Sequence, residues 1–203
     1  MNQNLTEIVF ILDRSGSMGG LENDTIGGFN GFVKKQAKDG QTSLTTVLFD
    51  DRYEIIHNGI DAGKAVLTEK EYYTRGSTAL LDAVGKTITD VGNRLNETPE
   101  TSRPGKVIFV ITTDGLENAS REFSYNEVKK MITHQTETYN WEFIFMGANI
   151  DVAKEGEKLG IDTGRTFSFT ASSTGMNKMF KESYEACKTI RNSIPKNKKK
   201  TTV

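Results

Sequence analysis

Residues 8–20 read IVFILDRSGSMGG, and this stretch decides the fold that the sequence predicts. Its apolar beginning, IVFIL, is unbroken and rich in β-branched side chains, which is typical of a strand buried on both faces of a parallel sheet. The run stops at Asp13, and Ser15 and Ser17 follow on alternate positions. A tight turn with Gly16 in its middle can direct these three side chains toward one point. Hard oxygen ligands of this kind suit Mg²⁺ or Mn²⁺.

The rest of the chain alternates strand-like and helix-like segments, which is the pattern of an α/β protein with helices on both faces of a sheet. We therefore expect a Rossmann-like open sheet that is mostly parallel. Two short β-rich runs meet at Asp50 and Asp51, which predicts a hairpin and one antiparallel edge strand. Strands are predicted over residues 8–12, 43–49, 52–57, 107–111, 142–146 and 165–169, and helices over 21–37, 80–95, 125–139, 149–159 and 174–194.

Composition limits the classes of partner and location. The 203 residues include 26 basic and 27 acidic side chains, so the net charge of -1 gives no reason to expect nucleic acid or a membrane surface as a partner. We expect one domain over residues 1–195 and a basic C-terminal tail over 196–203. Cys187 is the only cysteine, and no signal peptide or membrane span is evident, which predicts a cytoplasmic protein.

Three segments are expected to meet at one edge of the sheet, because parallel strands with right-handed crossovers have their carboxyl ends together. Asp13 and the two serines follow the first strand, Thr78 lies where a helix begins, and Asp114 follows the strand expected beside the first. Each of these residues alone is explained more simply as a helix cap or a turn former. Their combination is what points to a metal site.

The segments DRSGSM, RGSTALLDA and TTDGLENAS match, in order and spacing, the three parts of a metal-ion-dependent adhesion site (MIDAS). The chain therefore resembles a von Willebrand factor type A (VWA) domain, and the resemblance covers nearly its whole length. Within that family it is most similar to small, stand-alone bacterial or phage proteins, including those associated with tellurite-resistance clusters.

The resemblance implies a ligand set for Mg²⁺ (or Mn²⁺), which consists of Asp13, Ser15, Ser17, Thr78 and Asp114. It implies that the two serines bind the ion directly, that the threonine binds directly or through water, and that the two acids lie close, largely through water. One position would stay open for an Asp or Glu of a partner protein. The predicted function is thus a magnesium-dependent protein-binding module with no enzymatic activity.

Two other functions stay open at this point. A metal-assisted hydrolase acting on phosphate esters is one, since a strand-end Asp beside magnesium also occurs in phosphotransfer enzymes. Against it, Arg14 occupies a loop position and no second acid follows Asp13 at the interval that such enzymes usually use. The other is a scaffold that never fills its metal site. Neither His57 nor His134 has clustered partners that suggest zinc or a catalytic triad.

Four residues near the predicted edge are candidates for its rim. Glu117 and Asn118 follow the Asp114 turn, and we favour an exposed loop over a role at the rim. Asn149 and Asp151 follow a later strand, and a helix cap explains Asp151 at least as well as a place at the site.

Overall fold

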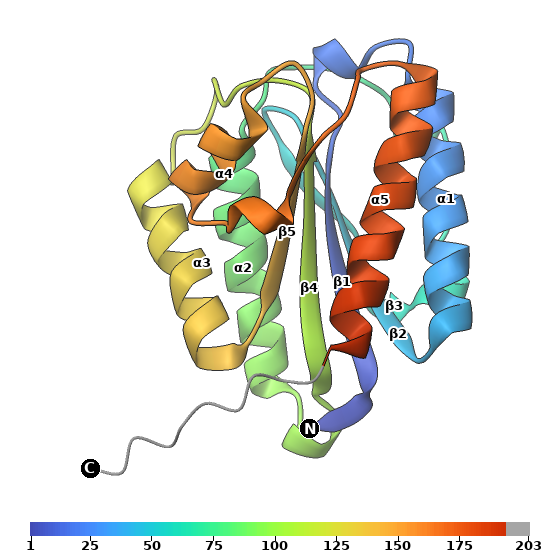
Figure 1. Cartoon of the computed structure of the whole chain (residues 1–203), viewed down its shortest axis with the longest axis vertical. Helices are drawn as coiled ribbons and strands as arrows, with labels where there is room; N and C mark the ends of the chain where they lie inside the picture. Colours follow the sequence, from blue (N-terminus) through green and yellow to red (C-terminus); the bar gives the residue numbers. More distant parts are fainter. Residues whose placement is uncertain (194–203) are drawn as a thin grey trace.

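The structure is a computed structural model that describes residues 1–193 of the chain. Within this part, six strands form one sheet and five α-helices lie against it (Figure 1). The strands are β1 (Asn2–Asp13), β2 (Thr42–Phe49), β3 (Tyr53–Asp61), β4 (Pro104–Thr113), β5 (Glu142–Gly147) and β6 (Thr166–Ser168). The α-helices are α1 (Glu22–Asp39), α2 (Leu80–Glu97), α3 (Tyr125–Tyr139), α4 (Val152–Leu159) and α5 (Ser173–Asn192).

The strand order is β3-β2-β1-β4-β5-β6, so β1 and β4 lie at the centre of the sheet. Neighbouring strands are parallel except for β2 and β3, which form an antiparallel hairpin at one edge. This arrangement confirms the predicted α/β, Rossmann-like sheet with one antiparallel edge strand. The carboxyl ends of the parallel strands lie together at the top of Figure 1.

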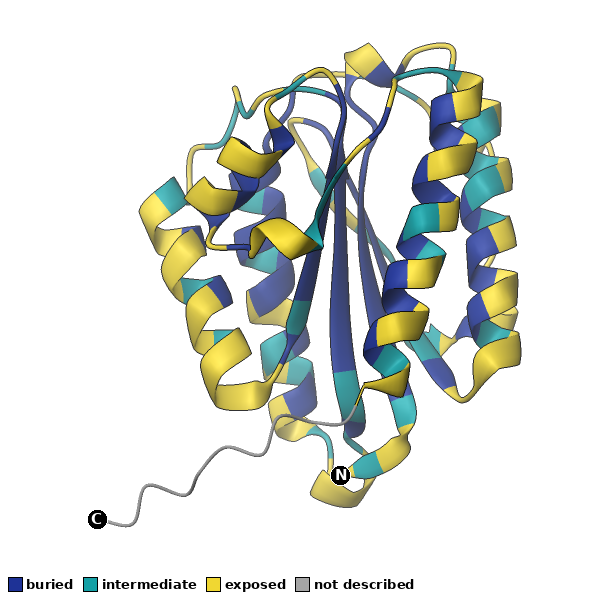
Figure 2. Ribbon diagram, viewed as in Figure 1, coloured by how far each residue is buried: buried dark blue, intermediate teal, exposed yellow. Residues whose placement is uncertain are grey.

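The central strand β1 contributes to two separate cores. Ile8, Phe10 and Leu12 pack with α1 and α5, whereas Val9 and Ile11 pack with α2, α3 and α4. All five side chains are fully buried, as the dark strands in Figure 2 show. Successive side chains of a strand point to opposite faces, so a strand covered by helices on both sides is apolar at every position. This explains the unbroken apolar run that opens the deciding stretch.

β1 begins at Asn2 rather than at the predicted residue 8, because polar residues continue its ladder. Glu7 pairs with β2 and β4 and is buried. Its carboxylate accepts a hydrogen bond from the Thr45 hydroxyl at 2.8 Å and forms an ion pair with Arg94 of α2. A buried acid with such partners is tolerated inside a sheet. An apolar pattern therefore underestimates the length of this strand.

Three glycines, Gly27, Gly28 and Gly31, lie inside α1, where close packing against the sheet would be the simplest reason for small residues. A Cβ on Gly28 would lie 2.2 Å from Cδ2 of Phe180, so this glycine permits close contact with α5. Among the described atoms, none lies within 4 Å of a Cβ placed on either of the other two. The constraint is one helix-to-helix contact rather than the sheet.

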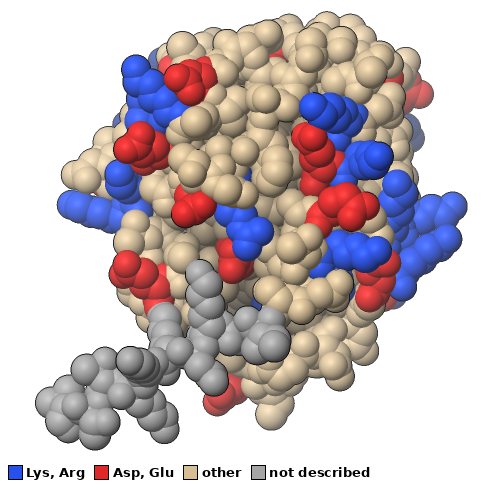
Figure 3. Space-filling view, in the orientation of Figure 1, with Lys and Arg blue, Asp and Glu red and all other residues tan. Residues whose placement is uncertain are grey.

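Acidic and basic side chains are interspersed over the face seen in Figure 3. Within residues 1–193, no helix is both long enough and apolar enough to cross a membrane. Cys187 is a buried free thiol, and burial raises its pKa to about 12. The cytoplasmic location stays a prediction. The predicted tail, 196–203, and the last two residues of the predicted domain lie outside the described residues.

Candidate metal centre

Two adjacent central strands deliver the two acids of the predicted site. Asp13 is the last residue of β1, and Asp114 directly follows the last residue of β4. In the parallel ladder between these strands Leu12 pairs with Thr112, so both acids leave the same edge of the sheet. The carboxyl edge of an open parallel sheet is where α/β proteins bind ligands.

Asp13 is enclosed, and both of its carboxylate oxygens have donors from the protein. The Ser15 backbone N–H donates to Oδ1 at 2.7 Å, and the Thr113 hydroxyl donates to Oδ2 at 2.7 Å. The Tyr72 hydroxyl donates to the Asp13 carbonyl oxygen at 2.7 Å. Burial raises the pKa of Asp13 to about 6, and the hydrogen bonds from Ser15 and Thr113 limit the rise. Asp13 therefore fixes the turn after β1.

The two serines and Asp114 form a short chain of polar contacts. Ser15 Oγ and Ser17 Oγ lie 3.1 Å apart, and the Ser17 hydroxyl donates to Asp114 Oδ1 at 2.6 Å. The second oxygen, Asp114 Oδ2, is buried and has no hydrogen-bond partner within the described residues. Burial raises the pKa of Asp114, and the Ser17 hydrogen bond opposes that rise.

Thr78 comes to the same place from the segment that precedes α2. Its side-chain hydroxyl and that of Ser17 each lie 3.9 Å from the position of a Cβ placed on Gly115, so the two hydroxyls face a common point. The Thr78 backbone N–H donates to Asn118 Oδ1 at 3.0 Å, and its carbonyl oxygen accepts from the Asn118 N–H at 3.0 Å. These bonds fix Thr78 independently of its side chain.

The structure thus places all of the predicted ligand residues at one edge of the sheet, namely Asp13, Ser15, Ser17, Thr78 and Asp114. From the sequence alone, Asp13 at a strand end and Thr78 at a helix entrance are expected to be exposed, and this expectation is wrong, since they are only 1% and 3% exposed. The contacts of Tyr72 with Asp13 and of Asn118 with Thr78 show which segments cover them.

This set of donors fits a small divalent cation. Carboxylate and hydroxyl oxygens are the ligands that Mg²⁺ and Mn²⁺ prefer. A buried carboxylate oxygen without a donor, such as Asp114 Oδ2, is unfavourable, and a cation beside it would remove the penalty. Residues 1–193 contain no group of three or more His, Cys, Asp or Glu side chains placed to hold a metal. Ion binding here would therefore depend on the hydroxyls.

Arg14 has a structural role that the sequence did not reveal. Arg14 lies in a loop, as predicted, but its side chain is fully buried. Its Nε donates to Asp50 Oδ2 at 2.9 Å, and its Nη2 donates to Glu54 at 2.8 Å. Arg75 Nε donates to the same oxygen of Asp50 at 2.6 Å. Although burial alone would raise it, the pKa of Asp50 is lowered, because Arg75 and Arg14 stabilise the carboxylate. This buried ion pair connects three loops behind the candidate metal centre.

One signal could have revealed the pair. An arginine directly after a buried strand needs an acid, and Asp50 follows Phe49, which pairs with Asp13 in the ladder between β1 and β2. We had assigned Asp50 only to the hairpin turn.

Glu117 and Asn118 lie in a loop, as predicted, and Asn118 is exposed, but both side chains also organise the rim. Glu117 Oε2 accepts from the Leu81 N–H at 2.9 Å, and its Oε1 accepts from the Ser120 N–H at 2.7 Å. Asn118 contacts the Thr78 backbone, as described above. Together they attach the loop after β4 to the first turn of α2, where free N–H groups need acceptors.

The two rim candidates that follow β5 have different roles. Asp151 caps α4 by accepting from the Lys154 N–H at 3.1 Å, which confirms the cap interpretation. Asn149 Nδ2 donates to the Asp114 carbonyl oxygen at 3.3 Å, so Asn149 supports the acid's backbone. His57 is a half-buried residue of β3 that contacts Thr46 and is stacked against Phe29, and neither of the two acids is among these contacts.

Comparison with solved structures identifies the fold. The vWF domain of the type V pili tip protein Mfa5 from Porphyromonas gingivalis superposes with a TM-score of 0.68 at 10% identity, covering 93% of this chain and 97% of that one. Manganese-loaded TRAP protein from Plasmodium vivax gives 0.62 at 18% identity, covering 90% and 74%. Proximal thread matrix protein 1 from the mussel byssus, solved with a zinc-occupied MIDAS motif, gives 0.60 at 16% identity, covering 92% and 46%.

These similarities establish that the chain has the VWA fold. At such low identities they establish the fold alone, and the chain spans less than half of the mussel protein. No protein-family model and no curated protein sequence matches the chain. Its assignment to the stand-alone bacterial or phage type therefore stays a prediction.

Proposed function

We propose that this protein is a divalent-metal-dependent protein-binding module. The observation that carries the proposal is the buried, unpartnered Asp114 Oδ2, which lies beside the hydroxyl chain of Ser17 and Ser15. Thr78 faces the same point, and Asp13 holds the turn that presents the serines. A zinc-occupied MIDAS in one structural neighbour and a manganese-loaded state of another support the proposal.

In this proposal Asp13, Ser15, Ser17, Thr78 and Asp114 hold Mg²⁺ or Mn²⁺. The bound ion would supply an electrophilic position that a carboxylate can complete, because hard cations prefer oxygen ligands. The partner is accordingly a protein that offers an Asp or Glu side chain. With only two acids in the ligand set, the site leaves part of the ion's charge for that partner.

Metal binding is the first test. Protein treated with chelator should bind Mg²⁺ and Mn²⁺ in a calorimetric titration, and Ca²⁺ should bind more weakly because short hydroxyl ligands in a tight turn favour smaller ions. Asp151→Ala is the matched control, since this strand-edge acid caps α4 instead of facing the site. Failure of the wild-type protein to bind any of these ions would overturn the proposal.

Partner capture is the second test. The immobilised protein should retain, from an extract of its native host, a protein that a chelator releases, and the double variant Ser15→Ala, Ser17→Ala should not. The same preparations should be assayed with a general phosphatase substrate and with nucleotides. Magnesium-dependent turnover that Asp13→Asn abolishes would favour the hydrolase instead. We expect capture without turnover, because an ion with one open position is suited to holding a carboxylate rather than activating water, and His57 contacts Thr46 and Phe29 instead of the ligand residues.

A further inference from the structure

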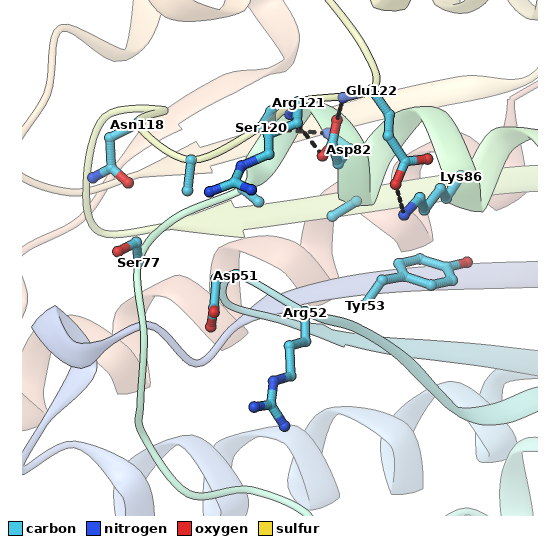
Figure 4. A pocket seen from close by; sticks show the side chains of 13 residues that line it. Asp51, Arg52, Tyr53, Ser77, Asp82, Lys86, Asn118, Ser120, Arg121 and Glu122 are labelled. Carbon is cyan, nitrogen blue, oxygen red and sulfur yellow. Dashed lines mark hydrogen bonds and ion pairs between the residues drawn. The ribbon is translucent and has the colours of Figure 1, made fainter.

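A hollow of about 590 Å³ lies beside the candidate metal centre (Figure 4). We call it the rim hollow. It is bordered by the hairpin turn at residues 51–53, by Ser77 and Ala79, by the first turns of α2 and by the loop at 118–122. Its volume lies in the range of sites that bind small ligands or a few side chains.

The rim hollow and the candidate metal centre share a wall. Ser77, which borders the hollow, is adjacent in the chain to Thr78, and Asn118 binds the Thr78 backbone N–H at 3.0 Å. A segment bound at the metal therefore has the hollow as its immediate neighbour. Arg121 follows Asn118 by three residues, a stretch of chain that spans at most about 10 Å, so about three extended residues of a partner cover the same length.

Two of the charges that border the hollow neutralise each other, and a third is held by backbone hydrogen bonds. The Asp82 carboxylate accepts from the backbone N–H groups of Arg121, Glu122 and Phe123, each at 2.9 Å. Lys86 forms an ion pair with Glu122 at 2.6 Å. The ion pair leaves no net charge at its end of the hollow, whereas Asp82 keeps its negative charge with both oxygens occupied by backbone N–H groups.

Arg121 is different. Within residues 1–193 neither its guanidinium nor that of Arg52 forms an ion pair. Figure 4 shows the Arg121 side chain extending over the hollow toward Ser77 and Asn118, whereas Arg52 points away. Asp51 is the remaining acid at this border.

The backbone that carries Arg121 is held in place. The Asp82 carboxylate binds its N–H, and Glu117 binds the N–H of Ser120 at 2.7 Å. A cation on a fixed loop loses less conformational freedom on binding than one on a mobile loop. The loop thus presents Arg121 to whatever lies next to the metal.

We propose that the rim hollow binds a second acidic side chain of the same partner segment, within about three residues of the carboxylate that completes the metal site, and that Arg121 pairs with it. This inference rests on the proposed function. The partner is then an acidic peptide segment, with one acid for the ion and one for Arg121.

Selection from random peptides displayed on phage tests both the proposed metal-dependent binding and the second acidic contact. Peptides should be bound to the wild-type protein in Mg²⁺ and eluted with a chelator. We expect enrichment of two acidic residues at short spacing. Absence of any chelator-released peptide would overturn the proposed function and this inference together. Enrichment of one acid, without preference for a second, would overturn this inference alone.

Two variants then locate the second contact. An enriched peptide should bind the wild-type protein about fivefold more tightly than its copy with the second acid changed to the amide, a ratio typical of an exposed ion pair. Arg121→Gln should reduce that ratio to about one. Arg52→Gln, which removes an unpaired cation of the same border, should keep it. An unchanged ratio in Arg121→Gln would overturn the inference, and so would an equal loss in both variants.

Discussion

The acids that end β1 and β4 have the same chemistry and adjacent positions, yet their surroundings differ. Both oxygens of Asp13 accept hydrogen bonds from the protein, from Ser15 and Thr113. Asp114 has one oxygen bonded to Ser17 and one that is buried without a partner in the described structure. The protein itself therefore supplies donors to both carboxylate oxygens of Asp13, whereas the second oxygen of Asp114 would gain a partner only from an added ligand. The proximity of an acid to a site does not tell which of these two roles it has.

The largest effect is expected for the acid with the free oxygen. Asp114→Ala should abolish the thermal stabilisation by Mg²⁺, which for a metal at about 100 times its Kd is about 2.7 kcal/mol. For a domain of this size that corresponds to a rise in Tm of roughly 5 to 10 °C. Without metal the variant should be no less stable than wild type, because the loss of the Ser17 hydrogen bond is offset by removal of a buried carboxylate oxygen that has no donor.

Differential scanning fluorimetry with and without Mg²⁺ measures this effect. Asp151→Ala should keep the metal-dependent rise and lose about 1 kcal/mol of stability as a helix cap. A full metal response in Asp114→Ala would mean that the two acids do not differ as described.

The pH dependence of stability should differ between the metal-free protein and its Asp13→Asn variant. Burial raises the Asp13 pKa from 3.8 to about 6, so the folded state binds more protons than the unfolded state between these values. Stability from this group is present below about pH 4 and is lost as the pH rises through about 6, a total on the order of 3 kcal/mol.

Urea denaturation between pH 5 and pH 8 should reveal about half of that loss in wild type relative to the variant. Mg²⁺ affinity should change in the opposite direction and weaken below about pH 6, because protons compete with the ion for the acids. Parallel pH curves for the two proteins would show that Asp13 does not titrate in this range.

Two substitutions of Asp13, to Ala and to Asn, should distinguish the loss of a hydrogen-bond acceptor from the loss of charge alone. Asp13→Ala leaves the donors of Ser15 and Thr113 unsatisfied, so we expect it to be roughly 2 kcal/mol less stable than Asp13→Asn without metal. This exceeds the cost of about 1 kcal/mol for an exposed cap, because the residue is buried. Equal unfolding free energies for the two variants would indicate that the turn does not depend on these bonds.

The smallest effect concerns Thr78, which is fixed by its backbone rather than by its side chain. Thr78→Ala should fold normally and weaken Mg²⁺ binding by about tenfold, equivalent to the loss of about 1.4 kcal/mol. Thr78→Ser, which retains the hydroxyl, should restore most of the affinity. Isothermal titration of both variants checks this, and identical affinities would remove Thr78 from the proposed ligand set.

The sequence predicted the parts of the molecule that local chemistry determines. The apolar run of β1 predicted a strand that is buried on both faces. The order of DRSGSM, RGSTALLDA and TTDGLENAS was enough to predict that their side chains meet at one edge of the sheet. Whether these side chains bind metal stays a prediction.

What the sequence did not predict depends on contacts between segments that are distant along the chain. The partner of Arg14 lies 36 residues away, and Glu117 caps a helix that begins 37 residues earlier, so neither contact leaves a periodic signal. The burial of Asp13 and Thr78 likewise results from loops that fold over them. A residue at the end of a strand therefore looks exposed in the sequence, although loops from distant segments cover it in the folded protein.

The central place of β1 has a consequence for hydrogen exchange. From Thr6 to Leu12 this strand is paired on both sides, with β2 and with β4, so we expect its amides to exchange with solvent only when the whole domain opens. Asp13, Ser15 and Ser17 continue directly from this slowly exchanging unit. Free energy gained by a ligand held there would slow exchange throughout the sheet, rather than only in the loops that touch it.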